Sequence, residues 1–166
     1  MNYFKVSIGI FIALASSRFI PHPPNFTSLL ALSFYIPAIL GTRFIPALIG
    51  SFIITDLIIG YHGVTFFTWG SVLMIGLMSK FFLQNMTNRL IGALIGACLF
   101  YIITNFGVWS LGSYGYTLEG LIKCYLVAIP FFGNTLVSTL IFSSLIEIIL
   151  NKKKFLKKLF NKISSV

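Results

Sequence analysis

The chain has 166 residues, of which 57% are hydrophobic and 9% are charged, and its formal net charge is +9. Soluble domains carry about 25% charged residues, and the interior of so short a chain is too small to hide this much apolar surface, so the composition excludes a soluble globular protein and predicts a polytopic membrane protein. The positive charge is therefore no sign of nucleic-acid binding by itself, and Cys98 and Cys124 lack the spacing of a disulfide framework or a zinc site.

Six apolar segments follow one another along the chain. A spanning helix needs about 20 mainly apolar residues, within a range of about 17–25, and the candidates are residues 5–20, 26–41, 43–60, 64–84, 90–109 and 118–150. The first is expected to be a retained helix and not a removed signal peptide. The last is longer than one span needs and contains Pro130, so we expect a kink or an initial interfacial turn. Residues 1–150 thus predict one all-α domain, a bundle of about six transmembrane helices.

The positive residues are divided unequally between the two sides of such a bundle. With six spans, the side that holds both termini receives ten of the twelve, namely Lys5, Arg43, Lys80, Arg89 and the six lysines of the C-terminal tail. The opposite side receives Arg18 and Lys123. Because cytoplasmic loops carry the excess of lysine and arginine, both termini are predicted to be cytoplasmic.

The tail, residues 151–166, holds most of the net charge. Its lysines at 154, 157 and 158 alternate with apolar residues at 155, 156, 159 and 160, which is the spacing of a helix with one basic and one apolar face. Such a helix is suited to lie on an anionic lipid leaflet. We therefore expect a basic amphipathic cytoplasmic tail that binds anionic lipid, with an RNA-binding arm as the less favoured alternative.

The polar stretch between the first two apolar segments, residues 17–27, is the most unusual part of the sequence. It contains Arg18, His22, Asn25 and three prolines within a few positions. Proline cannot continue a helix, so this stretch must break the chain between two helices. It is either a rigid loop whose arginine meets lipid headgroups, or one wall of a site at the mouth of the bundle.

Several other polar residues fall on the same, outer side in this topology. We predict a solute-binding site there, lined by Arg18, His22, Asn25, Asp56, His62, Asn105, Trp109, Glu119, Lys123 and Asn134. The argument is convergence, since separate segments bring polar side chains to one membrane face, where burial without partners is costly. Trp109 is equally suited to an interfacial aromatic belt.

Asp56 is an aspartate inside a predicted span, and such a residue normally faces the bundle and has a partner. Arg18 is the expected partner, near the same boundary. The two residues form either a structural ion pair between helices or a pair that holds a ligand. A metal site made by His22, His62 and Asp56 is a weaker alternative, and we predict neither a metal nor a cofactor.

Two positions in the last segment have simpler explanations. Asn134 follows Pro130 and Gly133, so its amide either satisfies the carbonyl that the proline frees or forms the floor of the site. Glu147 lies close to the lysine tail, and a charge pairing with that tail is expected to explain it. Only Asn134 is therefore counted among the site residues.

The first helix presents Gly9, Ala13 and Ser17 at four-residue spacing. Small residues in such a row allow another helix to approach closely. The row is expected to serve either packing within the bundle or docking of a partner subunit.

Several stretches resemble the signatures of an uncharacterised bacterial inner-membrane protein family: RFIPHPPNFT (18–27), DLIIGYH (56–62), TNFGVW (104–109), TLEGLIKCY (117–125) and PFFGNT (130–135). The resemblance covers roughly residues 15 to 148 and implies a multi-pass protein of the bacterial inner membrane. More loosely, the architecture is similar to the substrate-binding subunits of energy-coupling-factor vitamin transporters. That similarity implies docking of energising transporter subunits on an alanine-rich stripe of the first helix, where this chain has Gly9, Ala13 and Ser17.

No sequence motif of an enzyme is present, such as HExxH, GxSxG or a phosphate loop. The favoured function is a membrane-embedded binding subunit, or a small transporter, for a small polar solute taken from the outer side. The alternative is a structural or accessory membrane protein whose polar residues only fix helix ends.

Overall fold

The computed structural model describes residues 2–163, with side chains as far as Lys153, and this part of the chain contains helices and no strand. The helices are α1 (Tyr3–Phe19), α2 (Leu29–Leu40), η1 (Thr42–Phe44), α3 (Ile45–Ile59), α4 (Thr65–Met78), η2 (Ser79–Phe82), α5 (Met86–Ser110), α6 (Leu118–Val127) and α7 (Ile129–Ile163). Each of the six predicted segments is helical. The expected break in the last one is confirmed, since the chain leaves α6 at Ala128 and Pro130 lies in the first turn of α7.

Four of the described helical stretches are long and apolar enough to cross a membrane: Thr42–Ile59, Thr65–Phe82, Met86–Ser110 and Ile129–Lys153. The protein is therefore an all-helical membrane protein. α2 is apolar but has 12 residues, because it starts after the proline-rich loop and stops at Gly41, whose φ of 94° suits glycine. α1 has 17 residues, at the lower limit for a span. Six full crossings remain a prediction.

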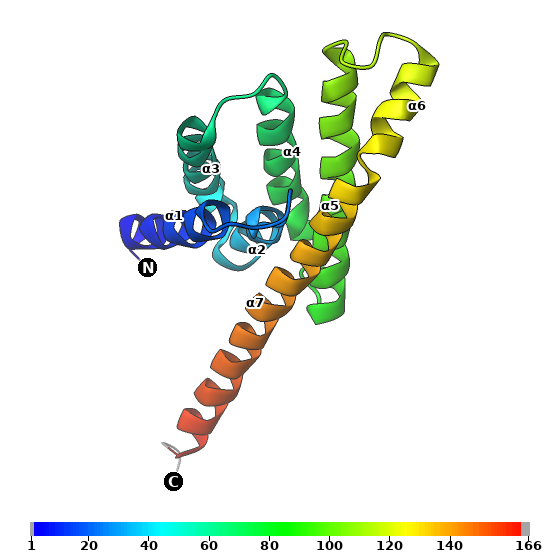
Figure 1. Cartoon of the computed structure of the whole chain (residues 1–166). Coiled ribbons are helices and arrows are strands. Elements are labelled where there is room, and N and C mark those ends of the chain that lie inside the picture. Colours follow the sequence, from blue (N-terminus) through cyan, green and yellow to red (C-terminus); the bar gives the residue numbers. More distant parts are fainter. Residues whose placement is uncertain (1, 164–166) are drawn as a thin grey trace.

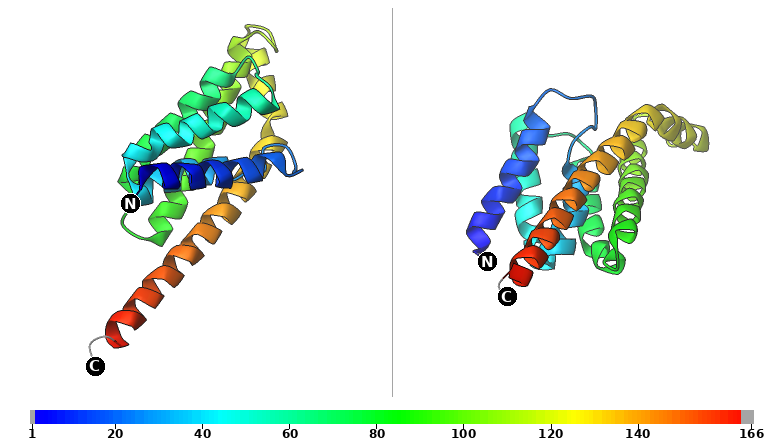
Figure 2. Two further views of the ribbon diagram at one scale, coloured as in Figure 1. Left: turned by 90° about the vertical axis from the view of Figure 1, so that its left-hand side faces the viewer. Right: turned by 90° about the horizontal axis from the view of Figure 1, so that it is seen from below.

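The helices form a tilted bundle with two distinct ends (Figure 2). The α1–α2, α3–α4 and α5–α6 loops lie at one end, which we call the loop end. The start of α1, the α2–α3 connection and the α4–α5 connection lie at the other, which we call the N-terminal end. α1 packs on α3, whereas α2 packs between α4, α5 and α7. α6 contacts α5 and α7 at the edge of the bundle (Figure 1).

The core is centred on α2. Phe34 and Tyr35 of this helix are 0% and 1% exposed, and they pack with Phe44, Leu48 and Ile75. The outer surface is also apolar, as shown by Phe4 and Phe66, which are each 71% exposed. Apolar surface of this extent on several helices is normally covered by lipid.

α7 extends beyond the bundle as one continuous helix to Ile163 (Figure 1). The backbone of the predicted tail is thus helical as far as Ile163 and continues the preceding span. The side chains from Lys154 onward lie outside the described residues, as do residues 164–166 entirely. The basic face of the tail and its binding to anionic lipid therefore stay predictions.

Candidate functional site

Arg18 and Asp56 form the predicted ion pair, at the loop end of the bundle. Arg18 is in the last turn of α1 and Asp56 in the last turn of α3. The Nη2 atom of Arg18 lies 2.6 Å from Oδ1 of Asp56, and Trp69 Nε1 of α4 donates to Oδ2 at 2.7 Å. Nη1 of Arg18 donates to Thr55 Oγ1 at 2.5 Å, and the guanidinium lies over the ring of Phe52.

The contacts of this pair satisfy both carboxylate oxygens of Asp56. The side chain of Asp56 is 2% exposed and that of Arg18 is 13% exposed, so the pair is almost removed from solvent. Buried charges need partners, and here the partners come from three helices, α1, α3 and α4. The pair therefore fixes these helices to one another at the loop end.

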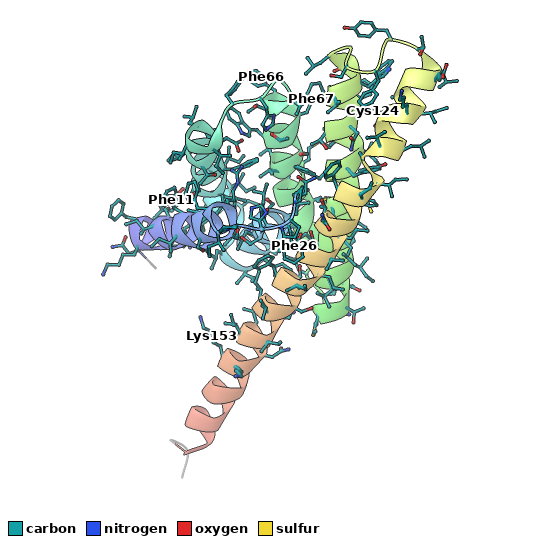
Figure 3. The ribbon with its side chains drawn as sticks, viewed as in Figure 1. Phe11, Phe26, Phe66, Phe67, Cys124 and Lys153 are labelled. Atoms are coloured by element: carbon teal, nitrogen blue, oxygen red, sulfur yellow. The ribbon has the colours of Figure 1, made fainter. Side chains whose placement is uncertain are left out.

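The proline-rich loop between α1 and α2 is held against α7. Asn134 Nδ2 donates to the carbonyl oxygen of Pro24 at 3.0 Å, and Ser138 Oγ donates to that of Asn25 at 3.5 Å. Phe26 lies beside α7, with its ring centroid 6.5 Å from that of Phe142 (Figure 3). Asn25 has a φ of 62°, which is uncommon for a residue other than glycine. The loop is thus an ordered wall of the bundle.

Two adjoining cavities open behind this wall and have five lining residues in common, namely Asn25, His62, Thr68, Phe100 and Thr135. One, of about 240 Å³, extends towards the ion pair and is also lined by Arg18, His22, Thr27, Leu29, Leu30, Phe52, Asp56, Ile59 and Ser138. The other, of about 330 Å³, extends towards α5 and is also lined by Val64, Tyr101, Thr104, Asn105, Val108, Ala128, Phe131 and Phe132. We call the two together the loop-end cavity.

The part of the cavity beside α5 combines aromatic rings with neutral hydrogen-bonding groups. Asn105 Nδ2 donates to the carbonyl oxygen of Tyr101 one turn earlier, at 2.8 Å, which leaves the side-chain oxygen available as an acceptor. The rings of Tyr101 and Phe132 stack with their centroids 4.4 Å apart. Ring faces next to a few placed polar groups are typical of small-molecule sites.

Six of the ten predicted site residues line the loop-end cavity: Arg18, His22, Asn25, Asp56, His62 and Asn105. The structure does not bring the other four into its lining. Asn134 binds the backbone of the loop and so supports the wall, as described above. Trp109 donates Nε1 to the carbonyl oxygen of Thr117 at 3.3 Å and contacts Tyr116.

Glu119 and Lys123 are exposed residues of α6. This helix lies at the edge of the bundle, on the far side of α5 from α3 and α4 (Figure 1). Sequence reasoning placed both residues at the loop end, but it had no means to see that α6 stands outside the ring of helices around the cavity.

Sequence reasoning missed Trp69 and the hydroxyl residues of the site. Trp69 completes the shell of Asp56, and Thr68 beside it lines both parts of the cavity. On α7, Thr135 and Ser138 are buried and face the cavity. Their signal in the sequence is weak, because serine and threonine are common in membrane helices. Only their positions one and four residues after Asn134, on nearby faces of the same helix, would have pointed to them.

Among the described residues, no group of three histidine, cysteine, aspartate or glutamate side chains could hold a metal ion. His22 and His62 do line the same part of the cavity. Asp56, the third member of the weaker metal alternative, has its two oxygens bound by Arg18 and Trp69.

A second buried ion pair lies away from the loop end. Glu147 of α7 is 0% exposed, and its Oε1 and Oε2 lie 2.6 and 2.7 Å from Nε and Nη2 of Arg89 on α5. Tyr35 of α2 also donates its hydroxyl to Oε1 at 2.9 Å. Arg89 is thus the partner of Glu147 among the described residues, and the expected pairing with the lysine tail, whose side chains from Lys154 onward lie outside them, stays a prediction. The glutamate points into the bundle, and the nearby lysines follow it on the same helix.

The small-residue row of α1 is only partly used within the chain. Ser17 forms a 2.7 Å hydrogen bond between its hydroxyl and that of Ser28. Gly9 and Ala13 are exposed, and a Cβ added at Gly9 would meet no atom within 4 Å. These two positions are open on the outside of the bundle.

Comparison with known proteins gives one match. No curated protein and no solved structure matches the chain. A model of a family of unknown function, DUF6580, matches residues 1–157. The match covers all the helices that surround the loop-end cavity and both buried ion pairs. The chain is a member of the DUF6580 family.

Proposed function

We propose that the protein is a membrane-embedded binding protein, either a binding subunit or a small transporter, for a small polar solute. The observation that carries the proposal is the loop-end cavity, whose walls come from the α1–α2 loop and from α3, α4, α5 and α7. A cavity of about 330 Å³ lies at the lower end of the range for small-molecule sites, about 300–1,000 Å³.

The lining favours a solute without net charge. Arg18 and Asp56 are the charged residues among the lining side chains, and they neutralise each other. The remaining polar groups are hydroxyls, amides and imidazoles, and they stand beside aromatic rings such as Phe100 and Tyr101. A neutral or zwitterionic molecule with several hydrogen-bonding groups and a ring or other apolar part would match these groups.

The proposed topology has six crossings, with both termini in the cytoplasm of a bacterium and the loop end outside its inner membrane. In support of it, the loop end and the N-terminal end alternate along the chain (Figure 2), and Lys5, Arg43 and Lys80 all belong to segments at the N-terminal end. A solute would then enter from the outside. α1 and α2 would cross the bilayer only with local thinning or with help from flanking residues, since both are short.

Energising transporter subunits are a further part of the proposal, and they rest on the architectural similarity to substrate-binding subunits of energy-coupling-factor transporters. The exposed positions Gly9 and Ala13 on α1 are compatible with the close approach of another helix. The stripe of this chain, Gly9, Ala13 and Ser17, departs from the alanine-rich stripe of those subunits.

The alternative function, a structural or accessory protein, is favoured by one observation. Both carboxylate oxygens of Asp56 are bound, by Arg18 and Trp69, and Arg18 also donates to Thr55 and Phe52, so the pair is held together without a ligand. Asn105 differs, because its side-chain nitrogen bonds Tyr101 while its oxygen forms no hydrogen bond with the described residues.

The test is to purify the full chain in detergent and to identify bound small molecules by mass spectrometry. Two matched variants on α5 sharpen it. Asn105→Ala removes an amide from the cavity, whereas Asn88→Ala removes one that bonds Gln84 on the exposed surface. Losing one good hydrogen bond lowers affinity by about tenfold, so solute should be lost from Asn105→Ala and retained by Asn88→Ala. Repeated purification of an empty chain would instead support the accessory function.

A further inference from the structure

One face of α7 is polar along its whole buried length. Thr135, Thr139, Ser143 and Glu147 follow each other at four-residue intervals and are between 0% and 4% exposed. Residues four apart lie one above the other on a helix, so these side chains form a single row that we call the hydroxyl face. It is turned towards α2 and α5, the helices that pack on α7.

Two members of the row lack hydrogen-bond partners. Thr135 Oγ1 donates to the carbonyl oxygen of Phe131 one turn earlier, at 2.9 Å. In the part of the chain that the structure describes, Thr139 Oγ1 and Ser143 Oγ are the buried side-chain atoms that find no partner. A hydroxyl in a membrane helix usually bonds its own backbone, and a buried hydroxyl without a partner is unfavourable. Buried water normally supplies the missing bond.

The two ends of the hydroxyl face meet the two polar clusters of the bundle. Thr135 lines both parts of the loop-end cavity. Three turns further along, Glu147 is held by Arg89 and Tyr35. The unpartnered hydroxyls of Thr139 and Ser143 lie between these ends. The row therefore connects the cavity with the buried cluster on the way to the N-terminal end.

We propose that the hydroxyl face is a water-lined passage by which the solute leaves the loop-end cavity towards the N-terminal end, and that Tyr35, Arg89 and Glu147 form the gate that closes it. The inference rests on the proposed function. The gate is shut here, because its bonds join α2, α5 and α7 and Glu147 is 0% exposed.

The chemistry of the passage matches that of the cavity. Hydroxyl groups both donate and accept hydrogen bonds, so Thr139 and Ser143 offer a neutral solute replacements for the partners it leaves behind. The charged residues at the far end are bound to each other. An uncharged passage of this kind would disfavour ions, which lose their hydration without compensation.

Cysteine labelling tests for water along α7 in the full chain in lipid vesicles. Cys98 and Cys124 are first replaced by alanine, and single cysteines are then placed at Thr139 or Ser143. Val137→Cys and Leu140→Cys are matched controls on the same turns, because these side chains are 51% and 46% exposed on the outer surface of the helix. The probe is a small, charged methanethiosulfonate, which reacts with a thiol in water and not with one in lipid.

The expected result is modification of Thr139→Cys and Ser143→Cys at least tenfold faster than of the two controls. Opening the gate with the double variant Arg89→Gln/Glu147→Gln should raise the rate at Ser143→Cys at least tenfold further. Rates equal to those of the controls, in a protein whose Thr135→Cys does react, would overturn the proposal.

A measurement on the unaltered chain covers the case in which a variant fails to fold. In solid-state NMR, magnetisation transferred from water should reach Thr139 and Ser143 as readily as Thr135, and it should not reach the bonded Thr55. No transfer to Thr139 and Ser143 would reject the passage. If no water reaches the hydroxyl face but mass spectrometry finds a bound solute, the passage is rejected and the proposed function is retained. If water reaches the hydroxyl face but no solute binds, the proposed solute-binding function is rejected, and only the presence of water along α7 is retained.

Discussion

Replacing Arg18 and Asp56, singly and together, separates a structural ion pair from a ligand-holding pair. In the single variant Arg18→Met, the carboxylate of Asp56 stays 2% exposed and loses its cationic partner. Breaking a buried pair by removing one partner costs about 3–5 kcal/mol of unfolding free energy. The reverse variant, Asp56→Leu, leaves Arg18, which is 13% exposed at the end of α1. Since a long side chain there reaches water more easily, we expect the smaller loss from this variant.

The double variant Arg18→Met/Asp56→Leu removes both charges and leaves apolar side chains of similar size. Replacing a whole buried pair in this way is often neutral. The remaining loss comes from Trp69, whose indole nitrogen no longer finds Oδ2 of Asp56. One unmade hydrogen bond of a half-buried group costs about 1 kcal/mol. We therefore expect the double variant to be more stable than either single variant.

The assay is reversible unfolding of the detergent-solubilised protein by denaturant, with the solute content of each folded variant measured by mass spectrometry. A double variant as unstable as Arg18→Met would refute the account of the pair as mutually compensating charges. A stable double variant that has lost its solute would show that the pair holds the ligand, whereas one that keeps the solute removes Arg18 and Asp56 from the binding residues.

Three more outcomes are expected. Tyr35→Phe should lower the unfolding free energy by about 1 kcal/mol, because Glu147 loses one of its bonds; an unchanged midpoint of denaturant unfolding would contradict this. A peptide of residues 151–166 should bind anionic vesicles with about 1 kcal/mol per lysine near the surface and detach as salt rises; equal binding to neutral vesicles would show that apolar contacts anchor it. Reporter fusions in the α1–α2, α3–α4 and α5–α6 loops should all be external, and one cytoplasmic signal would refute the six-span topology.

The general class of the fold could be predicted from the sequence because hydropathy alone decides it. The break before Pro130 and the break between α1 and α2, at residues 20–28, were also predictable, since proline excludes helix locally. The lengths of the helices were harder to predict from the sequence. Residues 26–41 form an apolar run, but helix α2 begins only at Leu29. Residues 26–28 belong to the loop instead, and Ser28 bonds Ser17 across its base.

The ion pairs show what sequence reasoning can and cannot find. Arg18 and Asp56 were predictable partners, because both lie near the same end of helices that can be neighbours and an intramembrane charge needs a partner. For Glu147, proximity in sequence favoured the lysine tail, and its contact with Arg89 was not foreseen. Arg89 is 58 residues away. Only the packing of α5 against α7 brings the two together.

Charged groups are not the ones that lack hydrogen-bond partners in the described part of this bundle. The two buried ion pairs are the most conspicuous polar features of the sequence, yet each is closed by its own neighbours, Trp69 in one case and Tyr35 in the other. In the part of the chain that the structure describes, the buried side-chain groups without a partner are neutral, namely the hydroxyls of Thr139 and Ser143. Inside a membrane such groups persist only where water or a ligand meets them. A solute of the proposed kind, neutral or zwitterionic and with several hydrogen-bonding groups, would match them.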